Sequence, residues 1–112
     1  MTDMTVKRLA DSSDLRALAL PDGDRDLSGV YIGDLLSWVM GRAQADNAWI
    51  TIMSNINVIA VASLSDVACV IFAEGVVPDE EIISTAMAKG VNLLVSECPI
   101  YETALKLSAL QI

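Results

Sequence analysis

Few side chains in this sequence can perform acid–base chemistry. The 112 residues include no histidine, the side chain that most often acts as a general base near neutral pH. Carboxylates form two close pairs, Asp24 with Asp26 and Glu80 with Glu81. The first pair lies in an expected turn and the second in the first turn of an expected helix, where carboxylates favour capping and solubility. We therefore expect no catalytic residues and no enzyme activity.

The glycines form no phosphate-binding motif. Six of them are scattered along the chain without a GxxxxGK or GxGxxG pattern, and no GxSxG nucleophile elbow occurs. The enzymatic alternative is a phosphotransferase acting on protein serine, which needs a nucleotide site that none of these motifs provides. No metal and no cofactor are expected, because a chain without histidine can hardly assemble a zinc site.

Short polar residues follow the expected strands, and they are the candidates for ligand binding. Ligands of parallel sheets collect at the carboxyl ends of the strands, where the N-termini of helices also point. Such ends supply hydrogen-bonding side chains and free backbone N–H groups, which suit a polar or phosphorylated small molecule. The alternative is that these residues only cap helices. The candidate ligand-binding residues are Asp34, Ser54, Asn55, Asn57, Glu74, Gly75 and Ser96.

The elements that must position these residues alternate from Asp34 onward. Asp34 is expected to cap a helix, whose apolar stripe predicts one buried face. The later elements are a strand from Trp49 to Met53, a strand from Ala68 to Ala73, a helix opened by Pro78 and ended by Gly90, a strand from Val91 to Val95 and a helix from Pro99. The stripe of the first helix consists of Leu35, Leu36, Val39, Met40 and Ala43.

The stretch from Asn55 to Leu64 is ambiguous between strand and helix. Its β-branched residues favour a strand by propensity. Topology favours a helix, since the buried strands on either side can pair in parallel only if a crossover connects them. We expect a helix, begun at residues 55–57 and closed at residues 65–66. Strand–helix alternation of this kind predicts an α/β fold with a parallel sheet and helices on its faces.

The first third of the chain is less regular. We expect a strand from Thr5 to Leu9, helix caps at residues 11–14, a segment from Leu15 to Leu20 that begins helical and ends extended, a turn at 21–24, and a strand from Leu27 to Ile32. Trp38 and Met40 on the following helix mark either a contact surface or part of the core, and the sequence leaves this open.

Composition restricts the class of protein. The chain is 54% hydrophobic with only 4% aromatic residues, so its core is aliphatic. A net charge of −8 disfavours nucleic acid as a partner. The longest apolar candidate, Ile56 to Leu64, is shorter than the roughly 20 residues that cross a bilayer, and the N-terminus shows no signal-peptide pattern. We expect a single cytoplasmic domain over residues 1–112, with Cys69 and Cys98 as free thiols rather than a disulfide or metal site.

Four runs resemble small stand-alone DRTGG-domain proteins of anaerobic bacteria, which are similar to the N-terminal domain of HPr kinase/phosphorylase. The runs are Tyr31 to Trp38, Ala48 to Ile52, Asn57 to Ala62 and Ala68 to Ile71. The Asp-Arg-Thr-Gly-Gly signature itself is absent, and its place falls at residues 54–57. The resemblance implies a three-layer sandwich with a mostly parallel sheet flanked by helices, which associates into a homodimer.

The resemblance also bears on function. The phosphate-binding loop and the catalysis of HPr kinase belong to a C-terminal domain that this sequence does not contain. In regulated pyrophosphatases a DRTGG domain sits among nucleotide-binding CBS domains. We therefore expect a non-catalytic regulatory module that binds a nucleotide, a phosphorylated metabolite or a protein partner. Stand-alone members resemble proteins encoded near iron hydrogenase subunits, so the alternative is an assembly subunit docking on a redox complex.

Overall fold

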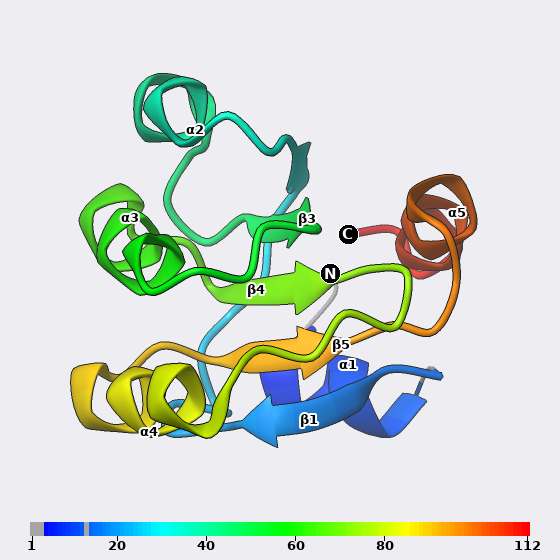
Figure 1. Cartoon of the computed structure of the whole chain (residues 1–112). Helices are drawn as coiled ribbons and strands as arrows, with labels where there is room; N and C mark the ends of the chain where they lie inside the picture. Colours follow the sequence, from blue (N-terminus) through cyan, green and yellow to red (C-terminus); the bar gives the residue numbers. More distant parts are fainter. Residues whose placement is uncertain (1–3, 13) are drawn as a thin grey trace.

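The computed structural model describes residues 4–12 and 14–112, which form one five-stranded sheet between two layers of helices (Figure 1). The strands are β1 (Arg16–Ala19), β2 (Val30–Ile32), β3 (Ala48–Thr51), β4 (Cys69–Phe72) and β5 (Leu93–Val95). The helices are α1 (Val6–Ser12), α2 (Leu36–Arg42), α3 (Asn57–Ser65), α4 (Glu80–Lys89) and α5 (Ile100–Ala109). This arrangement confirms the α/β sandwich expected from the sequence.

The sheet has the strand order β1-β5-β4-β3-β2, and the four strands from β2 to β5 run parallel. Each crossover moves the chain one strand further in the same direction. Because such crossovers share one hand, their helices α2, α3 and α4 all lie on one face, as Figure 1 shows. Helices α1 and α5 cover the other face. The first strand, β1, pairs antiparallel with β5 and makes the sheet mixed at that edge.

Strand residues alternate between two apolar cores, one on each face of the sheet. Trp49 and Phe72 belong to the core beneath α2, α3 and α4, whereas Ile50 and Ile71 belong to the core beneath α1 and α5. All four side chains are fully buried. Period-two alternation on strands that are covered on both sides explains why the sequence reads there as continuous apolar runs.

The ambiguous segment is a helix, as the topology argument predicts. Helix α3 ends at Asp66, which takes the left-handed conformation with φ of 59°. Four of its residues are buried, namely Val58, Ile59, Val61 and Ala62. The need to connect two parallel neighbours therefore outweighs β propensity in this segment.

The expected strand from Thr5 to Leu9 is wrong, because this segment forms helix α1. Val6 and Leu9 stand three residues apart, and both are fully buried on the same side of the helix. The hydroxyl of Thr5 accepts a hydrogen bond from the backbone N–H of Arg8 (3.2 Å), which is the geometry of an N-terminal cap. The helical spacing of the buried residues and the cap at Thr5 thus outweigh the β propensity of the two β-branched residues, Thr5 and Val6.

Other boundaries shift by smaller amounts. The segment from Leu15 to Leu20 has no helical start within the described residues and contributes β1 at Arg16–Ala19. The expected strand from Leu27 to Ile32 begins only at Val30, since Gly29 has a positive φ of 79°. Pro78 lies one residue before the N-cap of α4, and Pro99 is the N-cap of α5, so neither proline opens the first helical turn. Gly90 ends α4 in the left-handed conformation as predicted.

Cys69 and Cys98 are both free thiols. Cys69 is fully buried on β4, and burial raises the pKa of its thiol to about 12. This thiol therefore stays protonated at neutral pH, and it packs as a small apolar side chain. Across the part of the chain that the structure describes, no helix is long and apolar enough to span a membrane.

Candidate functional site

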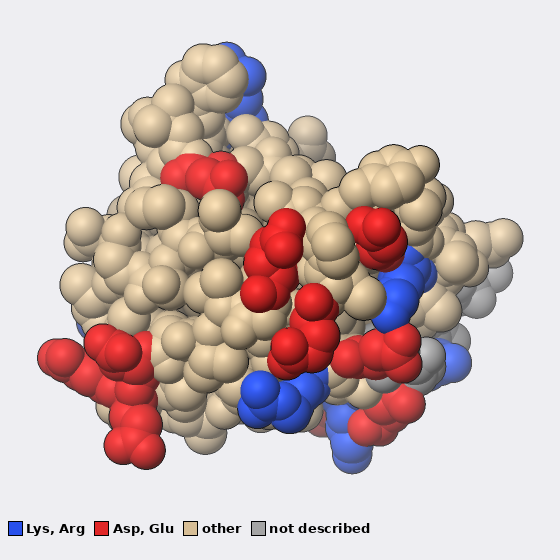
Figure 2. Space-filling view, turned by 45° about the vertical axis from the view of Figure 1, so that its right-hand side comes forward, with Lys and Arg blue, Asp and Glu red and all other residues tan. Residues whose placement is uncertain are grey.

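The carboxyl ends of β3, β4 and β5 meet at one edge of the sheet, which faces right in Figure 1 and comes forward in Figure 2. Figure 2 shows that Asp and Glu side chains outnumber Lys and Arg on this face. The loops and helix starts at the edge carry several exposed carboxylates, namely Asp34, Glu74, Asp79, Glu80, Glu81 and Glu97. An acidic edge repels phosphate and favours hydroxyl or amino groups.

The loops after β4 and β5 are joined by backbone hydrogen bonds. The N–H of Glu74 donates to the carbonyl of Cys98 (2.9 Å), and the N–H of Gly75 donates to the carbonyl of Ser96 (2.8 Å). The expectation of free N–H groups at Glu74 and Gly75 is therefore wrong. Ser96 is only 2% exposed, and its hydroxyl shares a hydrogen bond with Thr103 (2.7 Å). These three candidate residues hold the two loops together.

Glu74 and Gly75 form a tight turn with unusual backbone angles. Their φ values are 62° and 68°, and the N–H of Val76 donates to the carbonyl of Ala73 (3.1 Å). Two successive positive φ angles define a type I′ turn, which glycine adopts without steric cost. A Cβ atom added to Gly75 would lie 2.7 Å from the Oε1 atom of Glu97. The turn thus depends on glycine at position 75.

We expect Gly75→Ala to lower the free energy of unfolding by about 1–2 kcal/mol, measured by urea unfolding. The Glu97 side chain is exposed and flexible, so it can move away and the cost lies mainly in the backbone. The double variant Gly75→Ala/Glu97→Ala should therefore remain about as unstable as Gly75→Ala. Recovery of wild-type stability in the double variant would show instead that the steric clash is the cause.

Asp34 holds the end of β3 rather than capping α2. Its Oδ1 atom accepts hydrogen bonds from the hydroxyl of Thr51 (2.8 Å) and from the N–H of Ile52 (3.0 Å). The N-cap of α2 is Leu35, whose side chain forms no capping hydrogen bond. The predicted helix cap is thus wrong, and Asp34 instead fixes where the chain leaves β3 toward residues 52–57.

Asn55 forms the turn that precedes α3. Its Oδ1 atom accepts a hydrogen bond from the N–H of Asn57 (2.9 Å), and its carbonyl accepts one from the N–H of Val58 (3.1 Å). Asn55 thus stabilises the turn that leads into α3, whose N-cap is Ile56. Its side-chain nitrogen forms no hydrogen bond among the described residues and stays available at the surface.

Two hollows adjoin at Ile56, which lines both of them. The first, of about 570 Å³, lies between the β3–α3 loop and the start of α4. It brings Ser54 and Asn55 together with Asp79 and with Glu81, which the sequence had assigned only to capping and solubility. Its remaining lining residues are Ile52, Met53, Ile56 and Ile82.

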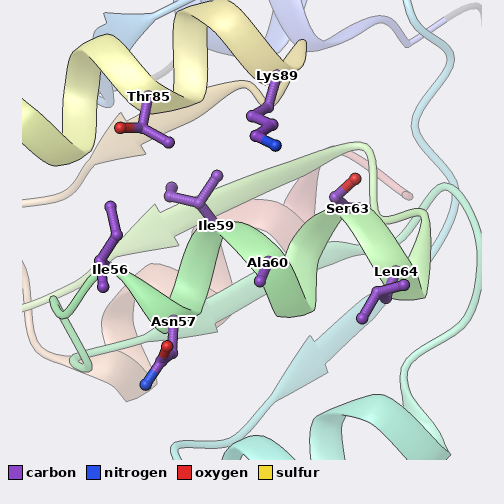
Figure 3. Close-up of a pocket in the computed structure, with 8 residues that line it drawn as sticks. All are labelled: Ile56, Asn57, Ile59, Ala60, Ser63, Leu64, Thr85 and Lys89. Atoms are coloured by element: carbon purple, nitrogen blue, oxygen red, sulfur yellow. The ribbon is translucent and has the colours of Figure 1, made fainter.

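The second hollow is a crevice of about 390 Å³ between α3 and α4 (Figure 3). Thr85 and Lys89 extend into it from α4, and the hydroxyl of Ser63 turns toward α4 from the other side. Asn57 lines the crevice, but its amide group points away from α4. The other lining residues are Ile56, Ile59, Ala60 and Leu64. Sequence reasoning missed Ser63, Thr85 and Lys89, because each has an ordinary helical context.

Trp38, which the sequence left open, lies at the surface. Its side chain is 52% exposed, and the guanidinium of Arg42 stacks over its ring at 3.8 Å from the centroid. Leu35 and Met40 on the same helix are also about half exposed. Only Val39 of the predicted stripe is fully buried, so α2 packs on the core along a narrow line.

Comparison with known proteins shows the fold. No protein-family model matches the chain, and no curated protein sequence matches it. A solved structure of the CBS and DRTGG domains from the regulatory region of Clostridium perfringens pyrophosphatase, in complex with the activator diadenosine tetraphosphate, superposes with a TM-score of 0.73 at 14% identity. The match covers 89% of this chain and 44% of that chain. The chain is therefore similar in fold to part of a regulatory region, and it spans less than half of that region's length.

Proposed function

We propose that this chain is a non-catalytic regulatory module that senses a small polar or phosphorylated ligand. The observation that carries the proposal is the pair of adjoining hollows at Ile56, one of which lies at the carboxyl end of β3, where a parallel sheet gathers its ligands. The described residues that line the two hollows include no cysteine. Their single lysine, Lys89, lies in the crevice, and their carboxylates, Asp79 and Glu81, lie in the other hollow. These groups suit binding better than nucleophilic catalysis.

Ser54 and Asn55 are the residues that we assign to ligand contact, whereas Asn57 lines the adjoining crevice with its amide turned away from α4. Ser54 and Asn55 offer a hydroxyl and an amide, and Asp79 and Glu81 beside them accept hydrogen bonds from hydroxyl or amino groups. This hollow therefore suits the sugar or base of a nucleotide better than its phosphates. We assign Asp34, Glu74, Gly75 and Ser96 to holding the surrounding loops, in line with their internal hydrogen bonds.

The pyrophosphatase regulatory region gives the first ligand class to test, because its solved structure holds a dinucleotide activator. A homodimer, a cytoplasmic location and kinship with the N-terminal domain of HPr kinase/phosphorylase belong to the same proposal. They follow from the sequence resemblance, and light scattering would test the first of them.

A thermal-shift screen against nucleotides and phosphorylated metabolites tests the proposal. A ligand that binds only the folded state at 100 times its Kd stabilises by about 2.7 kcal/mol, which raises the melting temperature of a domain of this size by roughly 10 °C. We expect one class of nucleotide to give a saturable shift that Ser54→Ala reduces, while Gln44→Ala, which removes an exposed amide outside both hollows, leaves it unchanged. A flat screen at millimolar concentrations would contradict the sensing role.

A second candidate function is favoured by the apolar surface of α2. Leu35, Trp38 and Met40 are each about half exposed on this one helix, which suits contact with a protein partner. In that case the chain is an assembly subunit of a larger complex, such as a redox complex. Pull-downs with wild-type protein and with Trp38→Ser would distinguish the two candidates, because only the docking function depends on Trp38.

A further inference from the structure

The crevice between α3 and α4 differs in charge from the rest of the surface. The chain carries 15 acidic and 7 basic residues, and yet the described lining of this crevice includes Lys89 and no carboxylate. Helix α3 contains no charged residue at all. One wall of the crevice is therefore neutral and the other presents a single cation.

Lys89 is free to bind a ligand. The ion pairs of the described residues involve Arg25 and Lys106 but not Lys89. Lys89 extends from α4 into the space above α3, and the hydroxyl of Ser63 turns toward α4 from the other side (Figure 3). The hydroxyl of Thr85 donates its hydrogen to the carbonyl of Glu81 (2.8 Å). The Thr85 oxygen can therefore only accept hydrogen bonds from a ligand, so the donors for an anion are Lys89 and Ser63. The ammonium of Lys89 and the hydroxyl of Ser63 thus line the crevice toward the same end, where α3 and α4 reach their last turns.

The remainder of the crevice is aliphatic. Ile59 is almost fully buried and forms its floor, while Ile56 and Leu64 are 45% and 71% exposed along its sides. Apolar side chains left exposed around a concave surface gain free energy when a ligand covers them. The volume of about 390 Å³ falls within the range of small-molecule sites.

We infer that this crevice binds a small organic oxyanion, with its charged head at Lys89 and Ser63 and its apolar body over Ile59 and Ala60. The head is a carboxylate or a phosphate monoester, since both accept hydrogen bonds from an ammonium and a hydroxyl. The inference deepens the proposed sensing function, on which it rests, by naming the group that recognises the anionic end of the ligand.

The test uses three probes with the same eight-carbon chain, octanoate, octyl phosphate and octanol, titrated into the ¹⁵N-labelled 112-residue protein and followed by NMR. We expect both anions to shift the amide signals of residues 56–64 and 85–89. At low salt they should bind about fivefold more tightly than octanol, which is the size expected for one partly exposed charge contact. The ratio of the Kd values of octanoate and octyl phosphate shows which head group is preferred.

Two variants separate the charge from the apolar body. Lys89→Gln should remove the preference for the anions and leave octanol binding unchanged, whereas Ser63→Leu, which narrows the crevice, should weaken all three probes. Lys7→Gln removes an exposed cation from the opposite helix layer and should change nothing. An anion preference that survives Lys89→Gln, or amide shifts confined to other residues, would overturn the inference.

Failure of this inference is distinguishable from failure of the proposed function. A metabolite that shifts the melting temperature equally in wild type and Lys89→Gln would leave the sensing function standing and remove Lys89 from it. If the octyl anions bind as expected but no metabolite stabilises the protein, the crevice is an oxyanion site and the proposed metabolite-sensing function is wrong.

Discussion

Replacing Trp49 by alanine should lower the free energy of unfolding by about 3–5 kcal/mol, the range seen when a buried aromatic side chain is removed. The indole is fully buried on β3 and packs in the core beneath α2, α3 and α4. Its Nε1–H also donates to the carbonyl of Gly33 (2.8 Å), which ties the end of β2 to the central sheet. Since small domains are stable by only about 5–15 kcal/mol, this loss should leave the variant marginally folded.

The chain supplies its own control in Trp38, the second tryptophan. Trp38 is half exposed, so Trp38→Ala should cost no more than about 1 kcal/mol in the same urea unfolding experiment. Equal effects of the two substitutions would contradict the packing described above, because it buries one indole and leaves the other at the surface.

The second large effect is expected for Asn92→Leu, which should destabilise the protein by about 2–4 kcal/mol. Asn92 is 1% exposed and forms three hydrogen bonds. Its Nδ2 atom donates to the carbonyls of Asp22 (2.8 Å) and Ala68 (2.9 Å), and its Oδ1 atom accepts from the N–H of Asp22 (2.9 Å). This one amide attaches the turn at 21–24 to the start of β4. Leucine fills a similar volume but leaves those backbone groups without a partner.

Asn55→Ala is the matched control for Asn92, because it also removes an asparagine that bonds to backbone. Asn55 is exposed and its side chain accepts one hydrogen bond from the backbone of the turn before α3, so its loss should cost about 1 kcal/mol. Urea unfolding of the two variants measures this difference in stability. If Asn92→Leu were no more destabilising than Asn55→Ala, the buried amide would not be the attachment that the structure indicates.

The alternation of strands and helices after Asp34 could be predicted because each signal there is local. Apolar runs mark the buried strands, Gly90 marks the end of α4, and the need for a crossover decides α3. The segment at Thr5 could not be read in the same way, since its two buried residues, Val6 and Leu9, acquire meaning only against the core that later elements build. Asn92 likewise gives no signal in sequence, because its three partners lie in the backbone of distant segments.

Part of the lining of the candidate hollows could be predicted from the sequence, but not the contacts around it. The sequence placed ligand binding at the strand ends, and Ser54 and Asn55 do line a hollow there. It could not foresee that the N–H groups of Glu74 and Gly75 would bond to the loop after β5, since that contact joins residues more than 20 positions apart. Lys89 is absent from the residues that the sequence singled out for binding. Its place opposite α3 depends on how two helices pack.

The central claim is that the protein binds its ligand without catalysis. One measurement tests both parts of it, namely phosphorus NMR of the nucleotide that gives the largest thermal shift. On titration with the protein, we expect its resonances to shift or broaden until they saturate, and no new resonance to grow during hours of incubation. Resonances that stay unchanged at millimolar protein concentration would contradict binding. New phosphate signals that accumulate with time would contradict the absence of catalysis and make the chain an enzyme.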